Sequence, residues 1–262
     1  MELITKIIKF ELSNTFRSKW IIVYSAFFLL LTFLLFNFEE DTNKAALSLM
    51  NIVLIVIPLV SLIFGTMYVY NSLDYIQMVL CQPINRKSLF VGLYLGNSIP
   101  IASGFLFGTL LGTILSGYSF IDNKSILILI VIGFALTFIF TAIAFWIAIK
   151  FSDKARGLGV SIIIWLMLSV VYDGLVLFLI YYFREYPIEN IALGVSLLNP
   201  IDLARIFFIL DFNVSALMGY TGALFNKFFG SSLGTILSIA MMFLWFVVPI
   251  LLGLKSFYKK DF

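Results

Sequence analysis

The stretch SILILIVIGFALTFIFTAIAFWIAI, Ser125–Ile149, has 25 residues and no charged side chain. A helix needs about 20 consecutive apolar residues to cross a bilayer, so this stretch is long enough and apolar enough to span a membrane. The sequence therefore predicts an all-α integral membrane protein, formed by one domain over residues 1–262, with six transmembrane helices. The other five apolar runs lie on either side of this one, at Trp20–Phe38, Ala46–Tyr70, Leu89–Leu115, Leu158–Phe183 and Leu233–Leu254.

The composition agrees with a chain that lies in lipid. Hydrophobic residues make up 62% of the chain and charged residues 12%, whereas soluble domains have about 45–50% and about 25%. The net charge is only +3 and the basic residues are spread along the chain, so no nucleic acid partner is predicted. Histidine is absent, which excludes HExxH zinc sites and histidine general bases. The single cysteine, Cys81, excludes an intramolecular disulfide.

The distribution of Lys and Arg predicts the orientation. With both termini in the cytoplasm, 12 of the 17 basic residues fall in cytoplasmic segments and five in outer ones. The positive-inside rule favours this arrangement, and an even number of spans agrees with it. The chain is therefore predicted to be a multi-pass membrane protein with both termini cytoplasmic.

Three segments are too polar or too short to span. Residues 1–19 place apolar residues on one helical stripe beside Lys6 and Lys9, which predicts a helix in the membrane interface; a plain membrane anchor is the equally weighted alternative. Residues 71–88 predict a cytoplasmic loop with a short helix that ends before Pro83. Residues 184–231 form a large outer loop, in which Asn199-Pro200 opens an apolar stretch. This loop predicts an extracytoplasmic helical hairpin before the last span.

Small residues recur every fourth position in the third span. This spacing lets helix backbones approach closely in lipid, and it serves either static packing or a sliding contact. Two polar side chains also lie within spans: Asp173 in the fifth, which is either a coupling site or reaches the headgroups, and Asn97 in the third. The glycines of the small-residue face are Gly92, Gly96, Gly104, Gly108 and Gly112, with Pro100 among them.

No catalytic, cofactor or metal site is predicted. The eight methionines form no MxM or MxxM cluster, so ordinary packing is favoured over Cu(I) binding. No GxxxxGK[ST] nucleotide motif is present. If transport uses ATP, the ATPase must be another chain.

Taken together, these features resemble the permease subunits of type-2 ABC transporters over the whole chain. The segment Met78–Ser88, MVLCQPINRKS, resembles the LLxxPxxR signature of the first cytoplasmic loop of that family. The resemblance implies a dimer of permeases that binds two separate ATPase subunits. It also implies an ATPase-docking segment, with Ile76, Leu80, Pro83 and Arg86 as its residues.

Two outer stretches, Leu198–Arg205 and Met218–Phe225, resemble the outer-loop motifs of the NosY-type permease of nitrous oxide reductase maturation. That resemblance implies a NosF-like ATPase, a NosD-like periplasmic partner and a location in a bacterial inner membrane. It implies a role in assembling the copper sites of the reductase, with a sulfur species as cargo. The residues assigned to the periplasmic element are Asn199, Pro200, Asp202 and Arg205.

Two alternatives remain open at this point. The first is an ABC-2 exporter of a lipid-like or peptide compound that serves self-protection. The second is a membrane scaffold or secondary transporter outside the ABC class. Secondary transporters often contain internal repeats, and no convincing repeat is found in this sequence.

Overall fold

The computed structural model describes residues 18–39, 41–118, 124–182, 194–211 and 232–260, together with Lys9, Glu11, Leu12 and Thr15. Within these ranges six helices are long and apolar enough to cross a membrane, which confirms the predicted number of spans. Most of the predicted segment 1–19 and much of 184–231, including Met218–Phe225, lie outside the described residues. The six spans are α2 Lys19–Phe38, α3 Thr42–Asn71, α5 Arg86–Leu115, α6 Lys124–Lys150, a fifth span that begins with α7 at Lys154, and α12 Ser232–Lys259.

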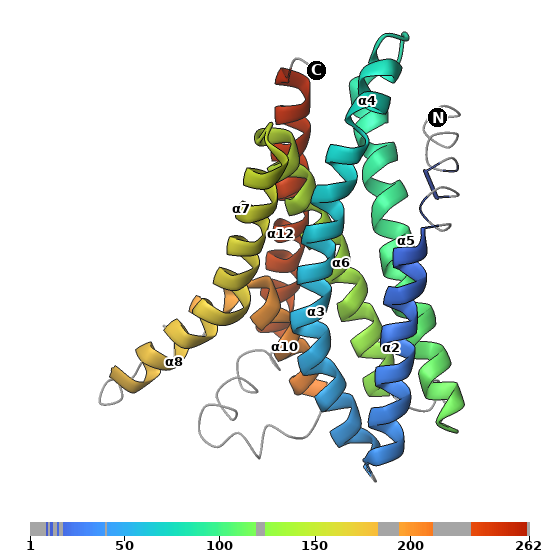
Figure 1. Cartoon of the computed structure of the whole chain (residues 1–262). Helices are drawn as coiled ribbons and strands as arrows, with labels where there is room; N and C mark the ends of the chain where they lie inside the picture. Colours follow the sequence, from blue (N-terminus) through green and yellow to red (C-terminus); the bar gives the residue numbers. More distant parts are fainter. Residues whose placement is uncertain are drawn as a thin grey trace.

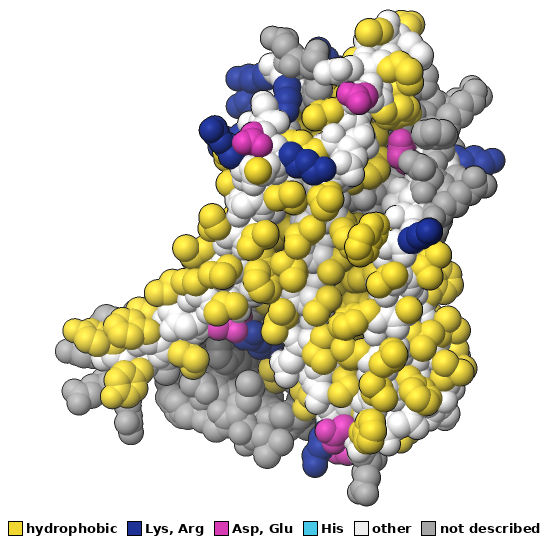
Figure 2. All heavy atoms as spheres, viewed as in Figure 1, with side chains coloured by type: hydrophobic (Ala, Val, Ile, Leu, Met, Phe, Trp, Pro, Cys, Tyr) yellow, Lys and Arg dark blue, Asp and Glu magenta, His cyan; other side chains and the backbone are white. Residues whose placement is uncertain are grey.

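The spans form an elongated bundle (Figure 1). The short helix α4, Leu73–Leu80, and the last turn of α12 lie at the same end, which is called the α4 end below; the opposite end is the far end. On the face shown in Figure 2, apolar side chains cover the length of the helices, and charged side chains gather toward the α4 end. This distribution is the one that a bilayer requires, because lipid-facing surfaces must be apolar.

Helix α6 forms the centre of the bundle. It packs against α3 and α12 most extensively and also against α5, α7 and α10, Pro200–Asp211. Most of its side chains are buried, among them Leu136, Ile139 and Phe145. A helix that is hydrophobic all round belongs in a core, and the uncharged sequence of this span explains its central place.

The small-residue face of α5 packs against α2. An added Cβ at Gly104 would lie 3.3 Å from Ile21 and Tyr24, and one at Gly112 would lie 2.7 Å from Thr32. The absence of side chains therefore lets the two backbones approach closely along their length. Gly92 is also buried, nearer the α4 end of α5. Asn97 is buried, and its amide nitrogen has no hydrogen-bond partner among the described residues.

The fifth span is not one continuous α-helix. It consists of α7, Lys154–Leu166, a π-helical turn η1, Met167–Val171, and α8, Tyr172–Tyr182. α8 leads away from the bundle in Figure 1. No proline or glycine lies inside Met167–Val171, so the sequence did not predict this break. π-helical turns are rare and occur often at functional sites, so the segment directs attention to its surroundings.

The close packing of α2 against α5 leads to a prediction about Gly108. A Cβ at Gly108 would lie 2.5 Å from the carbonyl oxygen of Ser25, so Gly108→Ala should destabilise the protein by about 1–3 kcal/mol through overpacking. Gly159→Ala in α7 is the matched control, because nothing lies within 4 Å of the added atom. Thermal unfolding in detergent measures both. Equal melting temperatures for the two variants would contradict the packing described here.

Candidate functional site

Helix α4 is anchored by one face and exposed on the other. Ile76 and Val79 are buried in a cluster that also contains Phe90 of α5 and Phe257 of α12. Gln77 and Met78 point outward, and 59% of Met78 is exposed. The helix is thus fixed to several spans while it presents a free outer face.

Arg86, the first residue of α5, connects this region to the end of the last span. Its Nη1 donates to the carbonyl oxygens of Phe257, Tyr258 and Lys260 at 3.3, 2.9 and 3.1 Å. The last carbonyls of a helix have no partner within the helix, and a basic side chain can satisfy them. Lys260 Nζ also donates to the carbonyl oxygen of Ile149 at 2.9 Å, which joins the chain after α12 to α6.

At the beginning of α5, the side chain of Asn85 accepts a hydrogen bond from the Lys87 N–H at 3.1 Å and caps the helix. The turn between α4 and α5 exposes Cys81, Gln82 and Pro83, while Leu80 is half-buried. The sequence-predicted docking residues therefore divide in two. Pro83 is exposed and Leu80 is half-buried beside it. Ile76 and the guanidinium of Arg86 instead contact the spans and hold the segment in place.

A second polar group lies beside the break in the fifth span. Arg205 of α10 forms a bidentate ion pair with Asp173 of α8, at 2.8 and 3.2 Å, and contacts Asp202 at 3.3 Å. The structure thus brings Asp173 together with two residues that the sequence placed in the outer loop. Burial raises the pKa of Asp202, an effect that Arg205 partly opposes.

Asn199 connects α10 to the π-helical turn. Its Nδ2 donates to the carbonyl oxygen of Leu168 at 2.8 Å, and its Oδ1 accepts the Ile201 N–H at 3.0 Å. Asn199 is fully buried, and it precedes Pro200, the first residue of α10. The Tyr172 hydroxyl also donates to the carbonyl oxygen of Val195. These contacts form a clamp, defined by Tyr172, Asp173, Asn199, Asp202 and Arg205, that fixes α10 to the fifth span.

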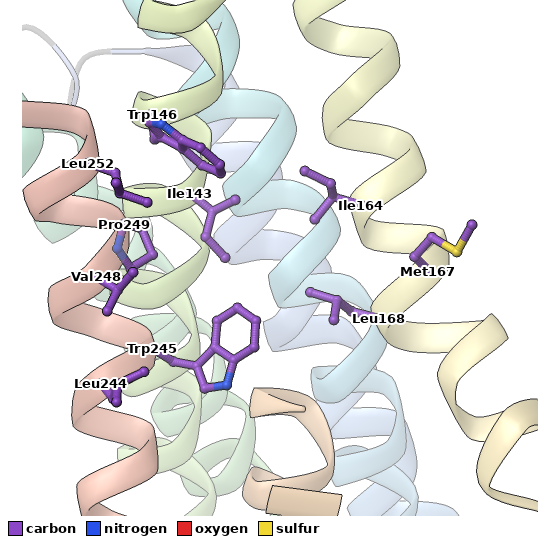
Figure 3. Close-up of a pocket in the computed structure, with 10 residues that line it drawn as sticks. All are labelled: Ile143, Trp146, Ile164, Met167, Leu168, Leu244, Trp245, Val248, Pro249 and Leu252. Atoms are coloured by element: carbon purple, nitrogen blue, oxygen red, sulfur yellow. The ribbon is translucent and has the colours of Figure 1, made fainter. Parts of the chain in front are cut away.

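A cavity of about 400 Å³ lies between α12 and the broken fifth span, and α6 also contributes to its wall (Figure 3). It is called the α7–α12 groove below. Ile143 and Trp146 come from α6, Met167 and Leu168 from η1, and Trp245 is one of five residues from α12. All ten lining side chains are apolar or aromatic, and no group of three or more potential metal ligands occurs among the residues that the structure describes.

One protein family, described as ABC-2 family transporter protein, has a sequence model that matches residues 5–262. The chain belongs to the ABC-2 transporter family. No curated protein matches the sequence significantly. Proteins of this family are the membrane permease subunits of ABC transporters and work with an ABC ATPase, so this chain is such a permease subunit.

One buried residue of the permease was missed by sequence reasoning. Glu11 is only 3% exposed, and its carboxylate accepts a hydrogen bond of 2.5 Å from the Tyr68 hydroxyl of α3. Its side chain lies against Gly96 of α5, where a Cβ would clash with it. Burial raises the pKa of Glu11, and the hydrogen bond from Tyr68 opposes this rise. Glu11 is one of two acids in residues 1–19, and its charge between the apolar Phe10 and Leu12 was the available signal.

The clamp makes a prediction about stability. Arg205→Ala leaves Asp173 and Asp202 without their cation and should destabilise the permease by about 2 kcal/mol, less than a fully buried pair because Arg205 and Asp173 are each about one-third exposed. Arg156→Ala is the matched control, since the Arg156–Asp153 pair is 80% and 54% exposed. Its cost should stay below about 1 kcal/mol. Thermal unfolding in detergent compares them, and equal losses would refute the structural role of the clamp.

Proposed function

We propose that this permease subunit supports assembly of the copper sites of nitrous oxide reductase, in a complex like that of NosY-type permeases. Two copies of the chain would bind a NosF-like ATPase at the α4 end and a NosD-like protein at the far side of the membrane. The observation that carries the proposal is helix α4, which is fixed to the spans by Ile76 and Val79 and exposed at Met78. The motif Leu198–Arg205 supports the Nos-specific part.

The exposed side of α4 suits docking of an ATPase. Asp74, Gln77 and Met78 face outward, and the exposed turn that contains Pro83 follows directly. Together they form a small surface with a methionine between polar side chains. Central apolar side chains with a polar rim are typical of protein interfaces.

The contacts behind α4 suit the transmission of force. Phe90 of α5 packs against Phe145 of α6 and Phe257 of α12, with ring centroids 6.0 and 5.7 Å apart. Arg86 adds hydrogen bonds to the end of α12. A displacement of α4 by an ATPase would therefore act on three spans together, because the packed side chains leave little room for independent movement.

In this proposal the α4 end is cytoplasmic and the membrane is the bacterial inner membrane. The excess of Lys and Arg in the segments assigned to that side supports the orientation. α10 then belongs to the outer half, where it packs against α3, α6 and α12 and is fixed to the fifth span by the clamp. Asn199, Asp202 and Arg205 would hold α10 in place for the extracytoplasmic partner.

The α7–α12 groove favours a second candidate, export of a lipid-like compound, because its lining is wholly apolar. The cargo would then be an amphiphile. A secondary transporter or scaffold outside the ABC class is not favoured, since the chain belongs to the ABC-2 family.

Docking is tested by Met78→Asp in the permease co-expressed with its ABC ATPase. A charge at the centre of the exposed face should abolish copurification of the ATPase, while the permease stays in the membrane. Lys44→Asp, which introduces the same side chain at an exposed position of α3 toward the far end, should leave copurification unchanged. Undiminished binding to the Met78→Asp permease would refute docking at α4.

The Nos-specific role is tested by deleting the gene in a nitrous-oxide-reducing host. The reductase isolated from the deletion strain should lack the absorption of its copper sites, and the unaltered gene should restore it. The Met78→Asp permease should fail to restore it, whereas Lys44→Asp should succeed. A reductase with complete copper sites in the deletion strain, together with increased sensitivity to an amphiphilic toxin, would instead support the exporter.

A further inference from the structure

The α7–α12 groove leads, at its α4 end, toward two lysines. Lys150 follows Trp146 by four residues on α6, and its Nζ lies 5.3 Å from the centre of the Trp146 ring. Lys255 follows Leu252 by three residues on α12 and is exposed. Residues three and four apart lie on the same face of a helix. Both ammonium groups therefore continue the two helix faces that line the groove.

The apolar part of the groove matches the hydrocarbon interior of a bilayer. It lies along α6, α7 and α12, all parts of membrane spans, and Leu244, Val248 and Met167 at its borders are exposed. The lining exposes no polar atom with which water could form a hydrogen bond, whereas a cavity of this size suits an apolar ligand. The occupant therefore enters from the surrounding hydrocarbon.

The groove together with the lysines beyond its α4 end matches the depth of one leaflet. At 1.5 Å per residue, the helix from Leu244 to Lys255 rises about 16 Å. Half of the hydrocarbon core of a bilayer is about 15 Å thick. An acyl chain that begins beside the two lysines would therefore reach the end of the groove near the middle of the membrane.

We propose that the α7–α12 groove is a binding site for an anionic phospholipid. The acyl chain lies against Trp245 and Val248, and the phosphate lies between Lys150 and Lys255. Anionic headgroups attract basic side chains at the membrane surface. A second copy of the chain covering the groove would bury both ammonium groups, which is unfavourable unless acids meet them. The proposal does not depend on the role in copper-site assembly.

Tryptophan fluorescence tests the site directly, because Trp245 lies in the groove (Figure 3). In the full-length protein, Trp20, Trp146 and Trp165 are replaced by Phe, which leaves Trp245 as the only tryptophan. The protein is reconstituted in phosphatidylcholine vesicles that contain a small fraction of lipid brominated on its acyl chains. Brominated phosphatidylglycerol should quench Trp245 more strongly than the same fraction of brominated phosphatidylcholine. Val248→Phe, which fills the groove, should remove most of the quenching by either lipid.

Variants that remove the lysine charges distinguish the contribution of the lipid headgroup to binding from that of the acyl chain. Lys150→Gln with Lys255→Gln should make the two brominated lipids equally effective, whereas Lys19→Gln with Lys87→Gln, two exposed lysines away from the groove, should preserve the difference. Equal quenching of Trp245 by both lipids in the single-tryptophan protein that retains Lys150 and Lys255 would overturn the proposal. Absence of quenching, with Trp245 protected by a second copy of the chain, would overturn it as well.

Discussion

The hydrocarbon interior of a membrane offers no hydrogen bonds, so every backbone N–H and C=O within it needs a partner in the protein. Helices satisfy this constraint along their length but not at their ends or at breaks. The permease uses side chains at these places. Arg86 donates hydrogen bonds to the last carbonyl oxygens of α12, and Asn199 donates one to the carbonyl oxygen of Leu168 in the π-helical turn. Both segments assigned to partners are fixed to the spans through such contacts.

Packing between the spans follows two different rules. α2 and α5 approach closely because Gly104, Gly108 and Gly112 have no side chains to keep the backbones apart. α6 instead fills the centre with large side chains, among them Phe140 and Phe145, that are buried against its neighbours. The first contact depends on backbone proximity and the second on side-chain volume, so single substitutions affect them differently.

The central helix α6 contacts both candidate partner-binding regions, the cluster around α4 and helix α10. Near the α4 end, α6 contributes Phe145 and Ile149 to the cluster that anchors α4. Farther along the bundle α6 packs against α10, which the clamp joins to the fifth span. The α7–α12 groove lies between these regions, with Ile143 and Trp146 of α6 in its wall. A movement that starts at α4 therefore has a contiguous set of packed side chains through which it can affect α10 and the groove.

The sequence by itself determined the six spans, since an uncharged run such as Ser125–Ile149 has no stable place outside lipid. It also singled out Asp173, because a charged group inside an apolar span is costly, whereas Asn199 and Arg205 were assigned only through the resemblance to NosY-type outer-loop motifs. The tertiary structure alone decided that Arg205 pairs with Asp173 and that Asn199 donates to the carbonyl oxygen of Leu168. It also decided that Glu11 is buried against Gly96, that Ile76 is buried, and that Arg86 bonds the end of α12. Local pattern sets which residues enter the membrane, whereas contacts between residues far apart in the chain depend on how whole helices pack.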